Sequence, residues 1–136
     1  MDKNKNTTMY TVKIREHIMI AHSLPDPVFG PAQNLHGATY VVDAEFQRPE
    51  LDEHQIVIDI GLASELLRKV LAPLAYQNLD DLPQFTGALT TTEYLARYIH
   101  DQLVGALDGS FPGSLKVILG ESHVAWASYQ GPSMLA

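Results

Sequence analysis

Cysteine is missing from this 136-residue chain. Without it the protein can form no disulfide bridge, no thiolate metal site and no cysteine nucleophile. Basic residues are few, since nine lysines and arginines stand against sixteen aspartates and glutamates, for a net charge of −7. That balance gives no basic surface for a nucleic acid or an anionic membrane.

Long hydrophobic runs are missing as well. No stretch approaches the roughly 20 apolar residues that a membrane-spanning helix needs. Residues 1–8 lack the apolar centre of a signal peptide. We therefore expect a cytoplasmic protein with neither a nucleic acid nor a membrane as its partner.

What the chain does contain is typical of one globular domain. Apolar residues make up 46% of it and charged residues 18%, the proportions of a chain that buries a core. Its length suffices for one such core. We expect residues 1–8 to form a flexible N-terminal tail and residues 9–136 a single domain.

Strand-like alternation occurs near both ends of the chain. Residues 10–22 and 38–47 place apolar side chains at every second position, which predicts two long strands. Residues 55–58 are expected to add a short edge segment. Residues 115–120 and 124–129 predict a closing hairpin.

Helical spacing occurs between those strands. Asp59 can cap a helix over residues 61–74, whose apolar residues recur every three or four positions. Thr90 and Glu93 have the spacing of a capping box, with Thr90 as the N-cap and Glu93 at the third helical position. The helix that follows is expected to bury Leu95, Ala96, Ile99, Leu103 and Leu107.

The order strand, strand, helix, helix, strand, strand predicts an α+β fold. It consists of a four-stranded antiparallel sheet, with two helices inserted between strands 2 and 3 and packed on one face. The edges of such a sheet need cover. We therefore expect the chain to oligomerise.

Six short segments resemble the motifs of one protein family. They are Ile20-Ala21-His22, Leu35-His36-Gly37, Ile58-Asp59, residues 73–80, Thr91-Thr92-Glu93 and Gly120-Glu121-Ser122. In order and spacing they are similar to the 6-pyruvoyl tetrahydropterin synthase family, including its 6-carboxytetrahydropterin synthase branch. The resemblance implies a tunnelling fold. Its subunits join edge to edge into trimeric barrels, two trimers stack into a homo-hexamer, and the pterin sites lie between subunits.

The zinc site that this resemblance implies is incomplete here. The family holds zinc with three histidines and leaves one position open. His22 and His36 stand at two of the three positions, but Ala38 stands at the third. His17 falls on the opposite face of its strand from His22 and cannot easily replace the missing ligand. We expect no metal and no cofactor, and a carboxylate from elsewhere stays open as a third ligand.

The family's catalytic groups are replaced too. The resemblance implies a carbon–oxygen lyase that eliminates triphosphate with a cysteine and an Asp-His pair. Here Ala32 stands at the cysteine position, and Ala75 and Tyr76 replace the pair. Alanine has no titratable group, and an unperturbed tyrosine titrates at about 10. We expect no catalytic residue of the family's kind and loss of the family's reaction.

The family's pterin anchor, by contrast, is present. A pterin ring offers two adjacent N–H donors, and a carboxylate can accept both in parallel, charge-assisted hydrogen bonds. Glu121 stands at the anchoring position. The predicted binding site for a pterin-like or guanine-like small molecule comprises Glu121, Thr91, Thr92, Glu93, His22, His36 and Tyr76.

Simpler interpretations exist for several of these side chains. Glu93 and the threonines also fit the start of a helix, and Glu121 also fits a solvated turn. His22 and His36 also fit structural residues that hydrogen-bond within the pocket. The remaining histidines that we expect at the surface are His54, His100 and His123.

Three functions are therefore open on the sequence, and we favour the first. It is a pterin-binding homologue that lacks triphosphate elimination. The second is an enzyme, either an active 6-pyruvoyl or 6-carboxytetrahydropterin synthase-type lyase or one of altered chemistry that uses Tyr76, His22 and His36. The third is a scaffolding homologue with a degenerate pocket.

Overall fold

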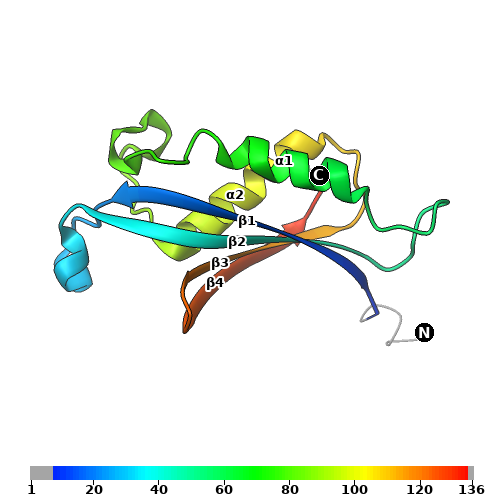
Figure 1. The fold of residues 1–136 in the computed structure, drawn as a ribbon, viewed down its shortest axis with the longest axis horizontal. Coiled ribbons are helices and arrows are strands. Elements are labelled where there is room, and N and C mark those ends of the chain that lie inside the picture. The colour runs from blue at the N-terminus through cyan, green and yellow to red at the C-terminus, as the bar shows by residue number, and fades with distance from the viewer. Residues whose placement is uncertain (1–7, 135–136) are drawn as a thin grey trace.

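The structure, a computed structural model, describes residues 8–134, so the predicted tail lies outside it except for Thr8. Four strands form one antiparallel sheet in the order β1-β2-β3-β4, and the two long helices lie together on one face of it (Figure 1). The strands are β1 (Tyr10–His22), β2 (His36–Arg48), β3 (Ser114–Ser122) and β4 (Ala125–Pro132). The helices are α1 (Ile60–Leu71) and α2 (Thr92–Leu107), with short 3-10 segments η2 (Pro27–Gln33), η3 (Leu79–Asp81) and η4 (Pro83–Phe85). The predicted α+β arrangement is confirmed.

The first two strands fix the position of the later site. Along β2 the side chains that face the helices are buried, namely Tyr40, Val42, Ala44 and Phe46. The antiparallel register sets His22 opposite His36 and Ile20 opposite Ala38. Strand β2 therefore begins two residues earlier than the apolar alternation predicted, because His36 and Gly37 pair with the end of β1.

Helix α1 ends earlier than the sequence predicted. Its start is as expected, since the Asp59 carboxylate accepts a hydrogen bond from the Gly61 amide at 3.3 Å. It ends at Leu71, three residues before the predicted Leu74, because tight turns follow. These turns bring Tyr76 to the edge of β1, where its amide donates to the Met19 carbonyl at 2.7 Å.

Helix α2 begins one residue later than the capping-box pattern predicted. Thr91, not Thr90, is the N-cap, and its hydroxyl accepts a hydrogen bond from the Tyr94 amide at 3.1 Å. Glu93 is consequently the second helical residue, so the predicted capping box is wrong. The Thr90 hydroxyl is engaged elsewhere, 2.9 Å from Nδ1 of His22.

The short strand predicted at residues 55–58 is not formed. The Asp52 carboxylate accepts hydrogen bonds from the amides of His54 at 2.8 Å and Ile56 at 3.3 Å. An aspartate that binds the backbone ahead of it favours a turn over a ladder. Gln55 takes a left-handed φ of 64° there, so residues 51–59 form a loop.

One of the three histidines expected at the surface is buried. Only 3% of His100 is exposed, and its ring packs edge-on against Tyr129 with centroids 4.8 Å apart. Its Nδ1 lies 3.0 Å from a carboxylate oxygen of Asp101. The prediction failed because histidine can lie on an apolar helix face when a neighbouring carboxylate pairs with it.

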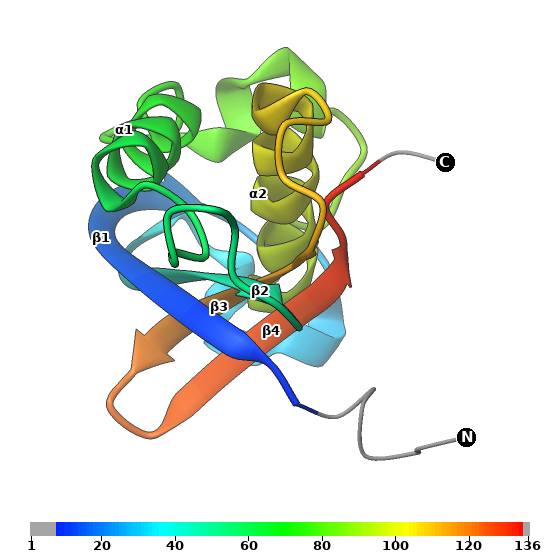
Figure 2. The same ribbon diagram turned by 90° about the vertical axis from the view of Figure 1, so that its right-hand side faces the viewer.

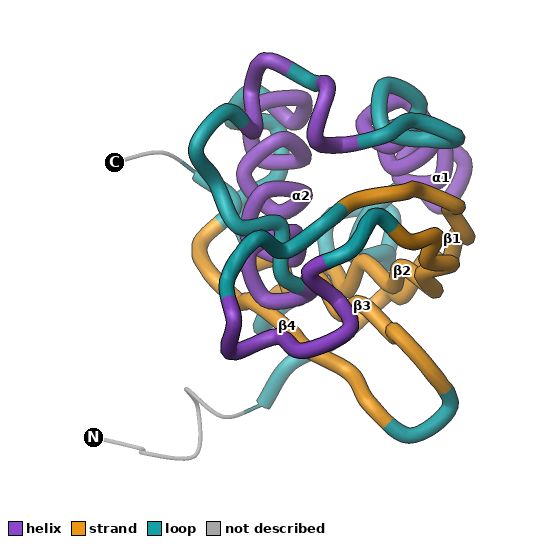
Figure 3. The backbone as a smooth tube through the Cα atoms, turned by 90° about the vertical axis from the view of Figure 1, so that its left-hand side faces the viewer, coloured by secondary structure: helices purple, strands orange, loops and turns teal. Residues whose placement is uncertain are grey.

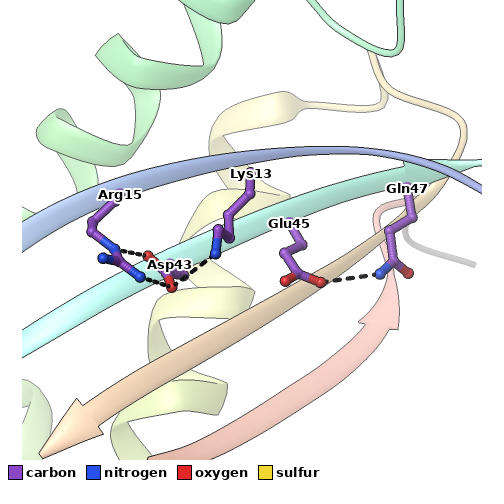
Figure 4. A network of polar contacts seen from close by, with 5 residues as sticks. All are labelled: Lys13, Arg15, Asp43, Glu45 and Gln47. Carbon is purple, nitrogen blue, oxygen red and sulfur yellow. Dashed lines mark hydrogen bonds and ion pairs between the residues drawn. The ribbon is translucent and has the colours of Figure 1, made fainter. Parts of the chain in front are cut away.

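The face of the sheet turned away from the helices is polar. Arg15 lies opposite Asp43 and donates two hydrogen bonds to its carboxylate, at 2.8 and 3.0 Å (Figure 4). Lys13 lies 3.7 Å from the same carboxylate. The hydrogen bonds from Arg15 hold the pKa of Asp43 below its usual value. Opposite charges on neighbouring strands thus help to fix the register.

The two outer edges of the sheet differ. Near its end, β1 is covered by the turn after α1, where the Ala21 amide donates to the Gln77 carbonyl at 3.0 Å. Within residues 8–134, no strand covers the outer edge of β4. Figure 2 shows β4 at the rim of the sheet, and Figure 3 shows the β3–β4 hairpin extending beyond the rest of the chain. No helix of the described chain is long and apolar enough to cross a membrane.

Two glycines provide a matched test of this packing. A Cβ at Gly113 would lie 1.9 Å from the Gln47 carbonyl oxygen, whereas a Cβ at Gly105 in α2 would meet nothing within 4 Å. We expect Gly113→Ala to lower the free energy of unfolding by about 2–3 kcal/mol. Gly105→Ala should raise it by about 0.5–1 kcal/mol, because alanine favours the helix. Urea denaturation measures both, and a stable Gly113→Ala variant would contradict the close packing of β2 and β3.

Candidate functional site

A hollow of about 250 Å³ lies where the ends of β1 and β3 meet the start of α2. Its lining residues come from five parts of the chain: His22, Leu24, Phe29, Ala32, His36, Tyr40, Thr91, Thr92, Glu93 and Glu121. Six of the seven residues predicted from the sequence are therefore brought together. The seventh, Tyr76, is not.

The two histidines form the inner wall of this hollow. His22 is 3% exposed, and the His22 and His36 rings meet edge to face with centroids 4.6 Å apart. Nδ1 of His36 lies 2.8 Å from the carbonyl oxygen of Asn34. Because a carbonyl only accepts, Nδ1 donates this hydrogen bond and is not available to a ligand.

Burial determines the charge of His22. Burial lowers the pKa of His22 below its ordinary value, and the neighbouring His36 lowers it further. At neutral pH His22 is therefore a neutral imidazole, with Nδ1 engaged by Thr90. Neutral imidazoles can bind a metal or exchange hydrogen bonds with a polar ligand.

These residues do not make a complete zinc site within one chain. Ala38 lies two positions from His36 along β2, on the same face, and has no atom that can bind a metal. In the described part of the chain, the acidic and histidine side chains that cluster closely enough to hold an ion are Asp52, Glu53 and His54, in the surface loop. His22 and His36 thus provide two ligands where a catalytic zinc site of this kind needs three.

Glu121 enters the hollow from an irregularity in the last hairpin. The register of β3 and β4 shifts between Gly120 and Ser122, and such a bulge turns a side chain out of the regular alternation. The Thr92 hydroxyl donates to a Glu121 carboxylate oxygen at 3.4 Å. No lysine or arginine of residues 8–134 forms an ion pair with this carboxylate.

Tyr40 is a site residue that sequence analysis missed, because it read as one more apolar position of its strand. It is 1% exposed, and its hydroxyl hydrogen-bonds with the Thr92 side chain. Burial, together with the nearby Glu121 carboxylate, raises the pKa of Tyr40 to about 12. The sequence did contain a sign of this role. Tyr40 is two residues after Ala38 and four after His36, so all three side chains lie on the same face of β2.

A second hollow of about 230 Å³ also borders Glu121. Thr92, Glu93 and Glu121 line both hollows, and residues 125–127 of β4 complete the second. Residues 125 and 127 are alanines, and their small side chains leave space beside Glu121. Glu121 therefore borders two hollows.

Tyr76 lies elsewhere on the molecule. It is 83% exposed and adopts a left-handed φ of 60°. It lines a separate hollow of about 340 Å³ beside β1 and α1, together with His17 and Arg68. One copy of the chain therefore does not bring Tyr76 to Glu121 or to the two histidines.

Several known proteins that are similar to this chain carry the same description. Residues 11–132 match the family described as 6-pyruvoyl tetrahydropterin synthase. The 6-pyruvoyl tetrahydrobiopterin synthase of Dictyostelium discoideum is 33% identical over 98 residues, which cover 71% of this chain and 72% of that protein.

Solved structures agree in fold. The 6-pyruvoyl tetrahydropterin synthase of Caenorhabditis elegans superposes with a TM-score of 0.80 at 23% identity, covering 90% of this chain and 96% of the other. The Plasmodium vivax enzyme, solved as a variant of a glutamate described as a catalytic residue, gives a TM-score of 0.75 at 18% identity, with 92% and 99% covered. On the extent of the sequence match, this chain belongs to the 6-pyruvoyl tetrahydropterin synthase family.

Proposed function

We propose that this protein binds a pterin-like or guanine-like ring through Glu121 and does not carry out the family's zinc-dependent triphosphate elimination. The observation that carries the proposal is the Glu121 carboxylate, which lines the hollow without a cationic partner among residues 8–134. A carboxylate in that state has acceptor positions free for a ligand. The ring's two adjacent N–H groups match it.

The groups around Glu121 support the same proposal. Thr92 holds one carboxylate oxygen, and Tyr40 in turn hydrogen-bonds with Thr92. A carboxylate positioned through such a network needs little reorganisation when a ligand arrives. His22 and His36 then offer polar contacts for the far side of the ring or its substituent.

The case against triphosphate elimination rests on what lines the hollow. Ala32, at the position of the family's cysteine, is one of the lining residues, so the side chain there has no nucleophile or acid. Two imidazoles stand where the family has three. Ala75 and Tyr76 replace the pair that would activate the cysteine, and neither is an ordinary base near neutral pH.

An active enzyme is the alternative, and one observation favours it. In the similar Plasmodium vivax protein a glutamate is described as a catalytic residue, so a carboxylate takes part in catalysis there. Glu93 and Glu121 both line the hollow in this chain. Conversion of dihydroneopterin triphosphate by the purified protein would favour this alternative over binding alone.

Assembly is part of the proposal. The uncovered edge of β4 needs a partner, and we propose a homo-hexamer built as a dimer of trimers, with the ligand sites between subunits. Tyr76 would then reach the site from a neighbouring copy, which is consistent with its exposed side chain and its place in a separate hollow of its own chain.

The first test removes the proposed anchor. Glu121→Ala should weaken binding of neopterin or guanine by about a hundredfold or more, because each hydrogen bond to a charged group contributes about 1.5–3 kcal/mol. Glu121→Gln should also bind poorly, because the NH2 group of its amide would face one of the ring's N–H donors. Titration calorimetry measures both variants.

One control and one milder variant of a proposed site residue accompany that test. Glu45→Ala removes a carboxylate from the opposite face of the sheet, where it bonds with Gln47 at 3.3 Å, and should leave affinity unchanged. Tyr76→Phe should change it little. If the parent binds no such ring, or if Glu121→Ala binds as tightly as the parent, the pterin-binding proposal is wrong.

The second test concerns zinc. The protein should carry much less than one zinc per subunit after dialysis, because two imidazoles hold the ion far more weakly than three. Ala38→His should raise zinc affinity markedly by restoring a third ligand beside His36. Elemental analysis measures the zinc content of both proteins. Near-stoichiometric zinc in the parent would contradict the proposed absence of a zinc site.

The third test concerns assembly. Light scattering at micromolar concentration should give roughly six times the 15.0 kDa subunit mass. A stable monomer would contradict the proposed site between subunits, because Tyr76 and the Glu121 hollow would then never meet.

A further inference from the structure

Tyr40 connects the sheet to the start of the last helix. It lies in β2 opposite Ile18 of β1, and only 1% of it is exposed. A tyrosine buried to this extent needs a hydrogen-bond partner for its hydroxyl. That partner is the side chain of Thr92, the first residue of α2. The position of the Thr92 hydroxyl is therefore coupled to a strand in the core.

The hydrogen bonds around Thr92 have one direction. A carboxylate only accepts, so the Thr92 hydroxyl donates its single proton to Glu121, at 3.4 Å. The Thr92 oxygen then accepts from Tyr40, and the Tyr40 hydroxyl is the donor. The order of donation is thus from Tyr40 to Thr92 to Glu121. In such a chain each hydrogen bond polarises and strengthens the next one.

Glu121 gains most from this chain because the sheet alone does not hold its side chain. It is an exposed residue at the register shift between Gly120 and Ser122. A distance of 3.4 Å is long for a hydroxyl donor. A Thr92 hydroxyl that rotated freely would therefore leave the carboxylate readily. Donation from Tyr40 occupies the other side of the Thr92 oxygen and directs its proton at Glu121.

We infer that Tyr40 is a positioning residue for the ring ligand, because it directs the Thr92 hydroxyl at one Glu121 oxygen and so orients the carboxylate. This inference rests on the proposed function and adds a residue to it. Two other roles are possible for a tyrosine in this place. It could only fill space in the core, or it could contact the ring itself, since it lines the hollow.

Removal of one hydroxyl tests the inference against a role in packing. Tyr40→Phe keeps the ring in the core but removes the donor, and we expect neopterin to bind about three- to tenfold more weakly. Tyr10→Phe is the matched control, because Tyr10 is 51% exposed and pairs with Arg48 at the opposite end of β1. It should leave the affinity unchanged. Calorimetry on the assembled protein measures both variants.

A double-mutant cycle tests the inference against direct contact with the ring. Thr92→Val should weaken binding at least about tenfold. Tyr40→Phe in that background should weaken it no further, because Tyr40 acts only through the Thr92 hydroxyl. Thr92→Ser retains the hydroxyl, so it should keep both the affinity and the sensitivity to Tyr40→Phe. If the two effects add, or if Tyr40→Phe binds as tightly as the parent, the inference is overturned while ring binding stands.

Crystal structures without ligand separate this inference from the proposed function. In Tyr40→Phe the Glu121 carboxylate should move away from the Thr92 hydroxyl, and in Tyr10→Phe it should stay. If the parent binds no ring but the carboxylate moves in Tyr40→Phe, the proposed function fails and the role of Tyr40 toward Glu121 is supported. If the carboxylate keeps its place in Tyr40→Phe, the inference is overturned whether or not a ring binds.

Discussion

One buried hydrogen bond connects the sheet to the last helix and fixes the geometry between them. His22 at the end of β1 and Thr90 just before α2 are both 3% exposed, and they meet at 2.9 Å. A buried imidazole nitrogen without a partner would be costly, so Thr90 is held at the sheet. The helix must then start at the next threonine, and Thr92 comes to lie within reach of Glu121.

The alanines change the chemistry of the site more than its shape. The pairing of β1 with β2 keeps His22 opposite His36 whatever residue occupies position 38, because backbone hydrogen bonds set the register. Alanine at positions 32 and 38 therefore leaves the hollow folded, with a methyl group at each of the two positions. The Glu121 carboxylate, which accepts a hydrogen bond from the Thr92 hydroxyl, is the group on which the proposed ring binding rests.

The sequence predicted the strands and helices well where periodicity was long. Residues 10–22 formed a strand as expected, since thirteen alternating positions leave little ambiguity. It failed where local polar groups competed for the backbone. The pattern of three successive threonines does not determine which of them caps α2. At residues 55–58 the Asp52 carboxylate accepts hydrogen bonds from the His54 and Ile56 amides, which favours a turn over a strand. Tyr40 was misjudged because its partner Thr92 comes from another element. His100 was misjudged because Asp101 of its own helix pairs with the ring while Tyr129 of β4 packs against it.

Trp126 is the only tryptophan in the chain. It pairs with Gly120 across the last hairpin, and a Cβ on that glycine would lie 2.9 Å from its ring. Trp126 also lines the second hollow that borders Glu121. The protein's tryptophan fluorescence therefore arises from a single place, in the second hollow that Glu121 also lines. Its emission reports the local environment there without a label, so solvent exposure and subunit contact near Glu121 can be followed optically in the unmodified protein.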